Sequence, residues 1–445
     1  MFAIRYKEQN RTNSVIISIV LSIFRLEANV LKQFLTLGLC IFVSTIQGVE
    51  LAELQGSLLT QHPLFLSSNK RAAAYLESAR VVSALPDPEV KIGLSPAELV
   101  TRNGPIQSRL GFFQRIPNPV QRRWKRKDME SRASIESARE NQLRYQFIRE
   151  LKESFFEYWY LSKSLIIVEE NLELSRNWTD LIKTHYSFHN YLYPTLLSLQ
   201  VETLKLEDQV KSLESRRTIL SDQIQTLAWL PGDEVLPWPT WNRDVEEPPQ
   251  LEELDISRNP ELLVLESKID SGQAHIHLAK SEDNLSYQLG VEWTRIGSES
   301  FGSDPGKDAL MLSAGVQIPL QRKAARAKVR SSELRKQALA HERDALHRTL
   351  MTKQQEYMVT LVDNIREILL IETKLLPRVG EAMTSLKGTY QTGDIDYFSL
   401  LENLRLSLNL NLSLAKHQKS YWQTLARLEE LCGTSLFEET ADLTP

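Results

Sequence analysis

The stretch that decides the fold is "LSYQLGVEWT" at Leu285 to Thr294, together with "LMLSAGVQIPL" at Leu310 to Leu320. In both segments apolar and polar residues alternate with a period of two, which is typical of a strand with two different faces. A turn-rich loop, Gly297 to Asp308, separates them. The sequence therefore predicts an antiparallel hairpin, and strands of about 9 to 11 residues suit a tilted crossing of an outer membrane with an apolar exterior and a polar lumen.

A second hairpin is predicted earlier in the chain, at residues 87–116, as a counterpart to the hairpin at 285–320. A soluble sandwich hairpin with one buried face is the alternative, but two hairpins at equivalent positions favour the membrane. Four strands cannot close a barrel, for which about eight are needed, so the barrel must be shared between chains. In the first strand of the hairpin at 87–116, one face carries Val90, Ile92 and Leu94, and the other carries Lys91, Gly93 and Ser95. The returning strand carries Ile106, Leu110, Phe112 and Ile116, and the loop between the two strands holds Pro96, Asn103, Gly104 and Pro105.

The chain contains an internal duplication, because its features recur at an offset of about 200 residues. "FQRIP" ending at Pro117 answers "VQIP" ending at Pro319, and we assign both prolines to the transition from strand to helix. "HYSFHNYLYPTLLSLQ" from His185 likewise answers "TYQTGDIDYFSLLENL" from Thr389. The predicted parts are a leader at 1–48, a first repeat at 49–230 with a helical hairpin at 121–229, a Pro-rich linker at 231–250, a second repeat at 251–433 with a helical hairpin at 321–432, and a tail at 434–445.

The first 48 residues resemble a secretory signal, because Lys32 precedes an apolar run at 34–46 that is too short to span a bilayer. A single uncleaved membrane anchor is the alternative. Removal of the leader would take Cys40 and leave only Cys432, so the mature chain would have no internal disulfide.

Most of the remaining chain is predicted to be helical. Residues 321–376 contain no Pro and no Gly, and their apolar residues recur at steps of three and four. A tight turn at Tyr390 to Asp394 leads into a second helix that ends near Cys432. The helix before the turn and the helix after it are predicted to form an antiparallel pair. The first half has an equivalent pair with a break around 189–194.

Composition excludes several classes of function. The net charge of −4 gives no reason to expect a nucleic-acid partner. We find no catalytic residues, no cofactor motif and no metal site, since the pairs His185 and His189, and His275 and His277, lack a clear third ligand.

The second half resembles the TolC-type outer-membrane efflux protein family. The resemblance rests on "GVQIPL" at the end of the last strand, the Leu376-Pro377 step, and Tyr390-x-x-Gly393 followed by a Leu-rich helix. It covers the order of parts from about Leu51 to Gly433, although His189 replaces the turn glycine of the first half. "LGVEW" and "SAGVQIPL" are similar to members that serve metal-exporting and drug-exporting pumps.

The resemblance implies a mixed, mainly helical fold in a homotrimer, with a shared twelve-stranded barrel in the outer membrane and a periplasmic helical tunnel. The implied partners are a periplasmic adaptor protein and an inner-membrane pump, and the cargo would be metal ions or small toxic compounds. An exported coiled-coil scaffold or adaptor without a pore is the alternative function.

The candidate functional residues lie at the turn between the last two helices. Three copies of each inward acid would form a ring that selects cations, so we take Asp394, Asp396 and Glu402 as candidate gate and selectivity residues. The alternative role of Asp394 and Asp396 is to cap the helix and interact with its dipole. Tyr186, Tyr390 and Gly393 are the expected tip surface for the adaptor, although Tyr390 could also be a packing residue.

A basic cluster follows each returning strand, and both are predicted to lie just inside the membrane. They could meet anionic head groups, line the upper tunnel, or form a solvated helix face. The clusters are Arg122, Arg123, Lys125, Arg126 and Lys127 in one half, and Arg322, Lys323, Arg326 and Lys328 in the other.

Overall fold

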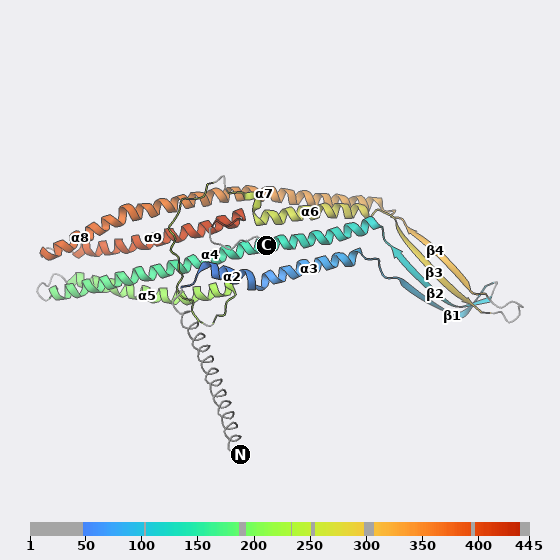
Figure 1. Ribbon diagram of the computed structural model, residues 1–445, viewed down its shortest axis with the longest axis horizontal. Helices are drawn as coiled ribbons and strands as arrows, with labels where there is room; N and C mark the ends of the chain where they lie inside the picture. The colour runs from blue at the N-terminus through green and yellow to red at the C-terminus, as the bar shows by residue number, and fades with distance from the viewer. Residues whose placement is uncertain are drawn as a thin grey trace, which may run out of the picture.

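The computed structural model describes residues 48–101, 104–186, 193–232, 234–250, 254–297, 307–392 and 397–436. These residues form an elongated molecule in which long helices run lengthwise and a sheet extends from one end at an angle (Figure 1). The predicted leader, apart from Gly48, and most of the predicted tail lie outside this description.

The sheet has four antiparallel strands in the order β1-β2-β3-β4, namely β1 (Glu89–Thr101), β2 (Gly104–Ile116), β3 (Ser286–Ile296) and β4 (Ala309–Gln317). Strands β2 and β3 pair from Ile106↔Ile296 to Ile116↔Tyr287, which joins the two hairpins although their sequences are far apart. Strands β1 and β4 are therefore the edges of the described sheet.

The first hairpin differs from its prediction. The expected loop around Pro96 to Pro105 is mostly strand, because β1 continues to Thr101 and β2 begins at Gly104. The register shifts between Leu94 and Leu99, and Pro96 falls in this irregular part of an edge strand. Proline is tolerated at such a place because its missing N–H removes no central ladder bond. Period-two alternation is lost at the irregularity, which made the segment look like a loop.

The helices are α2 (Leu51–Gln61), α3 (Pro63–Ser83), α4 (Pro119–Tyr186), α5 (Tyr193–Ala228), α6 (Pro260–Ser281), α7 (Arg322–Leu370), α8 (Leu376–Thr392) and α9 (Tyr397–Cys432), with a short 3₁₀ turn at Ile256–Arg258. Helix α4 has 68 residues and is the axis of the molecule. The half of α4 nearest the sheet packs against α3 and α6, and the other half packs against α5 and α9 (Figure 1).

Helices α3 and α6 each begin at a capping residue followed by proline. The His62 Nδ1 atom accepts a hydrogen bond from Leu64 N at 3.3 Å, and Pro63 opens α3. Asn259 Oδ1 accepts from Glu261 N at 3.0 Å and from Leu262 N at 3.1 Å, and Pro260 opens α6. In both helices the capping side chain satisfies backbone N–H groups that have no partner within the helix. The proline that follows takes the first helical position, where a backbone N–H would have no intrahelical acceptor.

The long helix of the second half changes winding before its proline. Residues Ile371–Leu375 form a π-helical turn between α7 and α8. Pro377 has no N–H to donate to the carbonyl four residues earlier, and a π-turn is one way to absorb the lost bond. The Leu376-Pro377 step therefore marks a local change of winding in a continuous helical path.

The main hydrophobic core lies at the middle of the helical body. The rings of Phe156, Trp241 and Trp422 contact one another, with centroids 5.1 Å apart for Phe156–Trp241 and 5.0 Å apart for Trp241–Trp422. Trp241 belongs to the segment between α5 and α6, which was predicted only as loop or extended structure. This segment closes the core and also holds Val49 through the bonds Val49 N→Trp238 O (3.3 Å) and Thr240 N→Val49 O (3.2 Å).

Candidate functional site

The sheet has one apolar face that is exposed. Leu289 and Val316 are each 52% exposed, and Leu312 is 76% exposed. These residues share a face because directly paired strand residues point to the same side and successive residues alternate. A row of solvent-exposed large apolar side chains on a sheet marks an interaction surface. The same face carries Val90, Ile92, Leu94, Leu110, Phe112, Tyr287, Val291, Trp293 and Leu310.

The opposite face of the sheet is polar and more enclosed. Arg109 Nη1 lies 3.9 Å from Glu292 Oε1, and Lys91 Nζ lies 4.9 Å from the centre of the Phe113 ring. Gly290 is buried beneath that ring, and a Cβ at this position would lie 2.5 Å from Phe113 Cδ1. The glycine is therefore required by the close approach of the Phe113 ring to the strand.

Both predicted transition prolines lie between a strand and a helix. Pro117 follows the end of β2 at Ile116, and Pro319 follows the end of β4 at Gln317. Proline cannot donate to a strand ladder, which suits the point where pairing stops. After Pro117, the Asn118 Oδ1 atom accepts a hydrogen bond from Val120 N at 2.8 Å at the start of α4.

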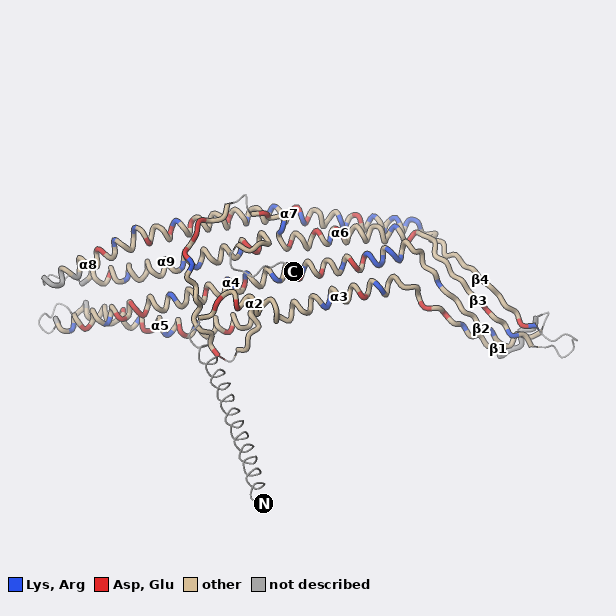
Figure 2. Tube along the Cα trace, in the orientation of Figure 1, with Lys and Arg blue, Asp and Glu red and all other residues tan. Residues whose placement is uncertain are grey.

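Lys and Arg residues gather along α4 and α7 where these helices leave the sheet, as the blue segments of the trace show (Figure 2). Some have acidic partners: Arg126 contacts Glu130 one turn later in α4 at 2.8 Å, and Lys328 of α7 contacts Glu282 at the end of α6. The two basic clusters predicted from the sequence thus occupy the same end of the helical body, beside the exposed apolar face.

Of the three candidate gate residues, the structure describes only Glu402, which lies at the opposite end of the helical body. Glu402 is in the first turns of α9, its side chain is half exposed, and its Oε1 lies 3.3 Å from Arg405 Nη1. Arg405 Nη2 also binds Glu202 Oε2 of α5 at 2.9 Å, which ties the two helical hairpins together. Asp394, Asp396 and Gly393 lie outside the described residues, and so do the side chains of Tyr186 and Tyr390.

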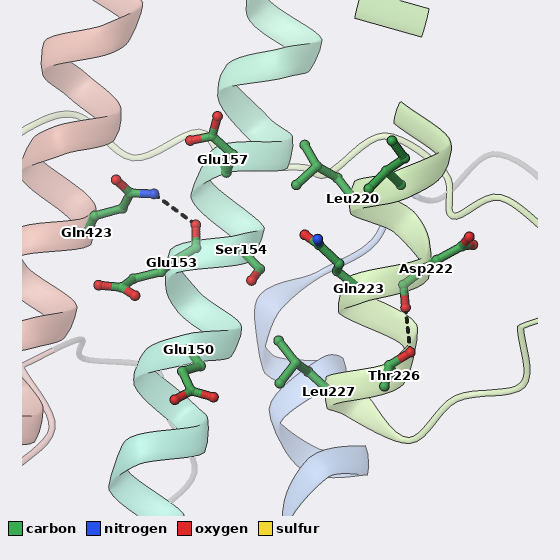
Figure 3. Close-up of a pocket in the computed structure, with 11 residues that line it drawn as sticks. Glu150, Glu153, Ser154, Glu157, Leu220, Asp222, Gln223, Thr226, Leu227 and Gln423 are labelled. Atoms are coloured by element: carbon green, nitrogen blue, oxygen red, sulfur yellow. Dashed lines mark hydrogen bonds between the residues drawn. The ribbon is translucent and has the colours of Figure 1, made fainter. Parts of the chain in front are cut away.

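A groove of about 730 Å³ runs between α4 and α5 near the middle of the molecule (Figure 3). Glu150, Glu153 and Glu157 of α4 lie on one side of it, and Leu220 and Leu227 of α5 lie on the other. Gln423 of α9 reaches the groove and donates a hydrogen bond from Nε2 to the Glu153 carbonyl at 2.9 Å.

The groove glutamates are largely compensated by neighbouring cations. Glu153 contacts Arg149 at 2.8 Å and Arg427 at 2.5 Å, while Glu157 contacts Lys419 at 2.8 Å. Within the described ranges, no group of three or more His, Cys, Asp or Glu side chains could hold a metal ion. The groove is therefore a poor candidate for a cation site.

A buried ion pair joins α4 to α9. Lys152 is 1% exposed and Glu429 is 4% exposed, and Lys152 Nζ contacts Glu429 Oε2. Burial lowers the pKa of Lys152, and the Glu429 carboxylate opposes this effect. Glu429 Oε1 also accepts a hydrogen bond from Leu436 N at 2.6 Å, so the pair fixes the segment after α9.

The pairing of Lys152 with Glu429 was not predicted from the sequence. A usable signal was present, because Lys152 lies four residues after Ile148 and four before Phe156, on a stripe of buried residues. A lysine in an apolar stripe needs a buried acid, and α9 supplies it. The contact between Arg405 and Glu202 was also missed, since nothing in the pattern pairs these two helices.

In the described part of the chain, no helix is long and apolar enough to cross a membrane. No protein-family model and no curated protein matches the sequence.

Solved structures share the fold. The outer membrane protein VceC of Vibrio cholerae matches with a TM-score of 0.71 and 13% identity, over 87% of this chain and 97% of that one. The open state of the MtrE outer membrane channel of Neisseria gonorrhoeae gives a TM-score of 0.72 and 14% identity, over 88% and 91%. The CmeC outer membrane channel of Campylobacter jejuni gives a TM-score of 0.68 and 12% identity, over 86% of this chain and 84% of that one.

These similarities confirm, at the level of fold, the resemblance to TolC-type outer-membrane channels. The prediction of a mixed, mainly helical fold is also confirmed, since the described chain is mostly helical with a small antiparallel sheet.

Proposed function

We propose that this protein is the outer-membrane channel of a tripartite efflux system. The observation that carries the proposal is the sheet, which exposes a continuous apolar face, has a polar opposite face and leaves two strand edges unpaired in the described chain. A sheet of this kind suits a transmembrane barrel wall with lipid outside and water inside. The fold shared with outer-membrane channels supports the same conclusion.

The barrel in this proposal is shared by three chains. Each chain supplies four strands, and an edge such as β1 or β4 is free to pair with a neighbouring chain. Twelve strands exceed the minimum of about eight for a closed transmembrane barrel. The internal duplication then places two equivalent hairpins of each chain around one axis.

The helices would form a tunnel in the periplasm. A periplasmic adaptor and an inner-membrane pump would meet the end that carries Glu402, with Tyr186, Tyr390 and Gly393 at the tip, and Asp394, Asp396 and Glu402 would form the gate. The cargo would be metal ions or small toxic compounds, and a passive conduit of this kind needs no catalytic site.

The topology can be tested with single cysteines. Leu289 and Val316 should face lipid, whereas Gln288 and Gln317 should face the lumen, because adjacent residues of a strand point to opposite faces. A membrane-impermeant thiol reagent should label cysteines at Gln288 and Gln317 several times faster than those at Leu289 and Val316 in reconstituted protein. Equal labelling of all four would favour the scaffold without a pore.

The native background of this experiment should be low. Cys432 is fully buried, and burial raises the pKa of its thiol to about 12. Only the thiolate reacts at an appreciable rate, so the unmodified mature chain should take up almost no label near neutral pH. The wild-type chain is therefore the matched control.

Assembly gives a second test. A single chain would leave two sheet edges and its exposed apolar strand face without partners. Chemical crosslinking in mild detergent should produce a ladder of bands that ends at three chains. A homogeneous folded monomer at every detergent concentration would contradict the shared barrel.

A further inference from the structure

A second cavity lies at the junction of the sheet and the helices, at the opposite end of the molecule from Glu402. Its volume is about 660 Å³, within the range of sites that hold small organic molecules. The end of α3 contributes Val81 and Leu85, and the connection to β1 contributes Asp87. Strand β2 contributes Arg115, and the first turns of α4 contribute Arg122 and Lys125.

The cavity has an excess of positive charge. Within the described chain, none of Arg115, Arg122 and Lys125 has a carboxylate within ion-pair distance, and Asp87 is the one acidic side chain among the described lining residues. Arg122 Nε is buried and has no hydrogen-bond partner there. A buried donor on a charged group is costly to leave unsatisfied, so this guanidinium lacks an acceptor that a bound anion could supply.

The cavity opens on the polar face of the sheet. Arg115 pairs with Gln288, and Ser286 pairs with Gln317 at the same end of the sheet. Directly paired residues point to one side, and these positions alternate with the exposed apolar residues such as Leu289 and Val316. In the proposed channel the cavity therefore lies on the lumen side, away from lipid, and this placement rests on the proposed function.

The walls combine charge with apolar surface. Val81 is 74% exposed and Leu85 is 50% exposed, so both offer apolar area that a ligand could cover. Arginine and lysine together suit sulfonate, carboxylate or phosphate oxygens. We propose that the cavity binds amphiphilic organic anions, with the anionic group on Arg122, Lys125 and Arg115 and the apolar part on the end of α3.

The inference can be tested by calorimetric titration of the detergent-solubilised full assembly, corrected for binding to empty micelles. The probes are naphthalene-1-sulfonate, its cationic counterpart 1-naphthylmethylammonium, and inorganic sulfate. Naphthalene-1-sulfonate should bind at least tenfold more tightly than either of the other two, because only it matches both the charge and the apolar wall. The double change Arg122→Gln and Lys125→Gln should weaken its binding about tenfold or more.

The matched control is Arg123→Gln with Arg126→Gln, which removes the same charge from the same turns of α4 but from residues that do not line the cavity. It should change the affinity by less than about twofold, since exposed charges contribute little. Equal losses in both double variants, or equal binding of the cationic probe, would overturn the site.

Two further experiments complete the test. The first asks whether the bound anion is a soluble molecule or a lipid, and the second separates the cavity proposal from the channel proposal. In vesicles of phosphatidylethanolamine, added phosphatidylglycerol should leave the affinity unchanged, and competition by this lipid would contradict a soluble anion on the lumen side. If the wild-type protein bound naphthalene-1-sulfonate but the four cysteine variants were labelled equally, the anion site in the cavity would stand. Only its assignment to the lumen of a channel would be contradicted.

Discussion

Glu429→Gln should lower the free energy of unfolding by about 3 to 5 kcal/mol, because it removes the Glu429 carboxylate that pairs with the buried Lys152. The glutamine keeps an oxygen that can accept the hydrogen bond from Leu436 N, so the loss reports mainly on the ion pair. The measurement is denaturant unfolding followed by the fluorescence of the tryptophans, of which Trp241 and Trp422 lie in the adjoining core.

Two further variants make this prediction specific. The double change Lys152→Met and Glu429→Gln should recover most of the stability, since replacing a buried pair with uncharged groups is often neutral. Glu430→Gln is the matched control on the next residue, where Glu430 Oε2 contacts Arg149 at 2.6 Å on a partly exposed surface. It should cost about 1 kcal/mol or less. If the double variant were as unstable as Glu429→Gln, the buried charge would not be the cause.

The destabilisation should also depend on pH. Burial holds the pKa of Lys152 below its ordinary value of 10.5, and loss of Glu429 removes the interaction that opposes this shift. Between the folded and unfolded pKa values the unfolded chain binds more protons, so stability rises with pH. This rise should be steeper in Glu429→Gln, and its deficit relative to wild type should shrink as the pH approaches 10.

Much of the sheet could be predicted from the sequence. Strict alternation in Leu285 to Thr294 and in Leu310 to Gln317 reflects two environments on the two faces, and β3 and β4 form there. The pattern failed where β1 becomes irregular around Pro96, since an irregular edge strand need not alternate. The division into two structural repeats remains a prediction.

The polar contacts of the candidate sites could not be predicted in the same way. Helical periodicity assigns a residue to a face of its own helix but does not say which helix lies opposite. The pair of Lys152 with Glu429 and the contact of Arg405 with Glu202 both join segments about 200 residues or more apart. Likewise, the cavity at Arg122 depends on how α3, α4 and the sheet meet, which no local pattern encodes.

The contact of Arg405 sharpens the proposal for the gate. Arg405 lies between Glu402 and Glu202, so the Glu402 charge is partly compensated. Because an ion-paired acid attracts a passing cation less strongly than an unpaired acid does, we expect Glu402→Gln alone to change the cation selectivity only modestly.

The combined change Asp394→Asn, Asp396→Asn and Glu402→Gln should therefore lower the cation-to-anion permeability ratio several-fold and relieve block by divalent cations. The physical reason is that three chains would bring nine carboxylates close together in the proposed entrance, where a narrow passage strengthens their field. The measurement is single-channel recording in planar bilayers, with crosslinking to confirm that the variant still assembles. The matched control is Glu77→Gln, Asp344→Asn and Asp363→Asn, which removes equal charge from three exposed acids, each in contact with an arginine as Glu402 is. If both triple variants shifted the permeability ratio equally, the effect would come from net charge, and the three acids at the tip would be helix caps and solvated surface.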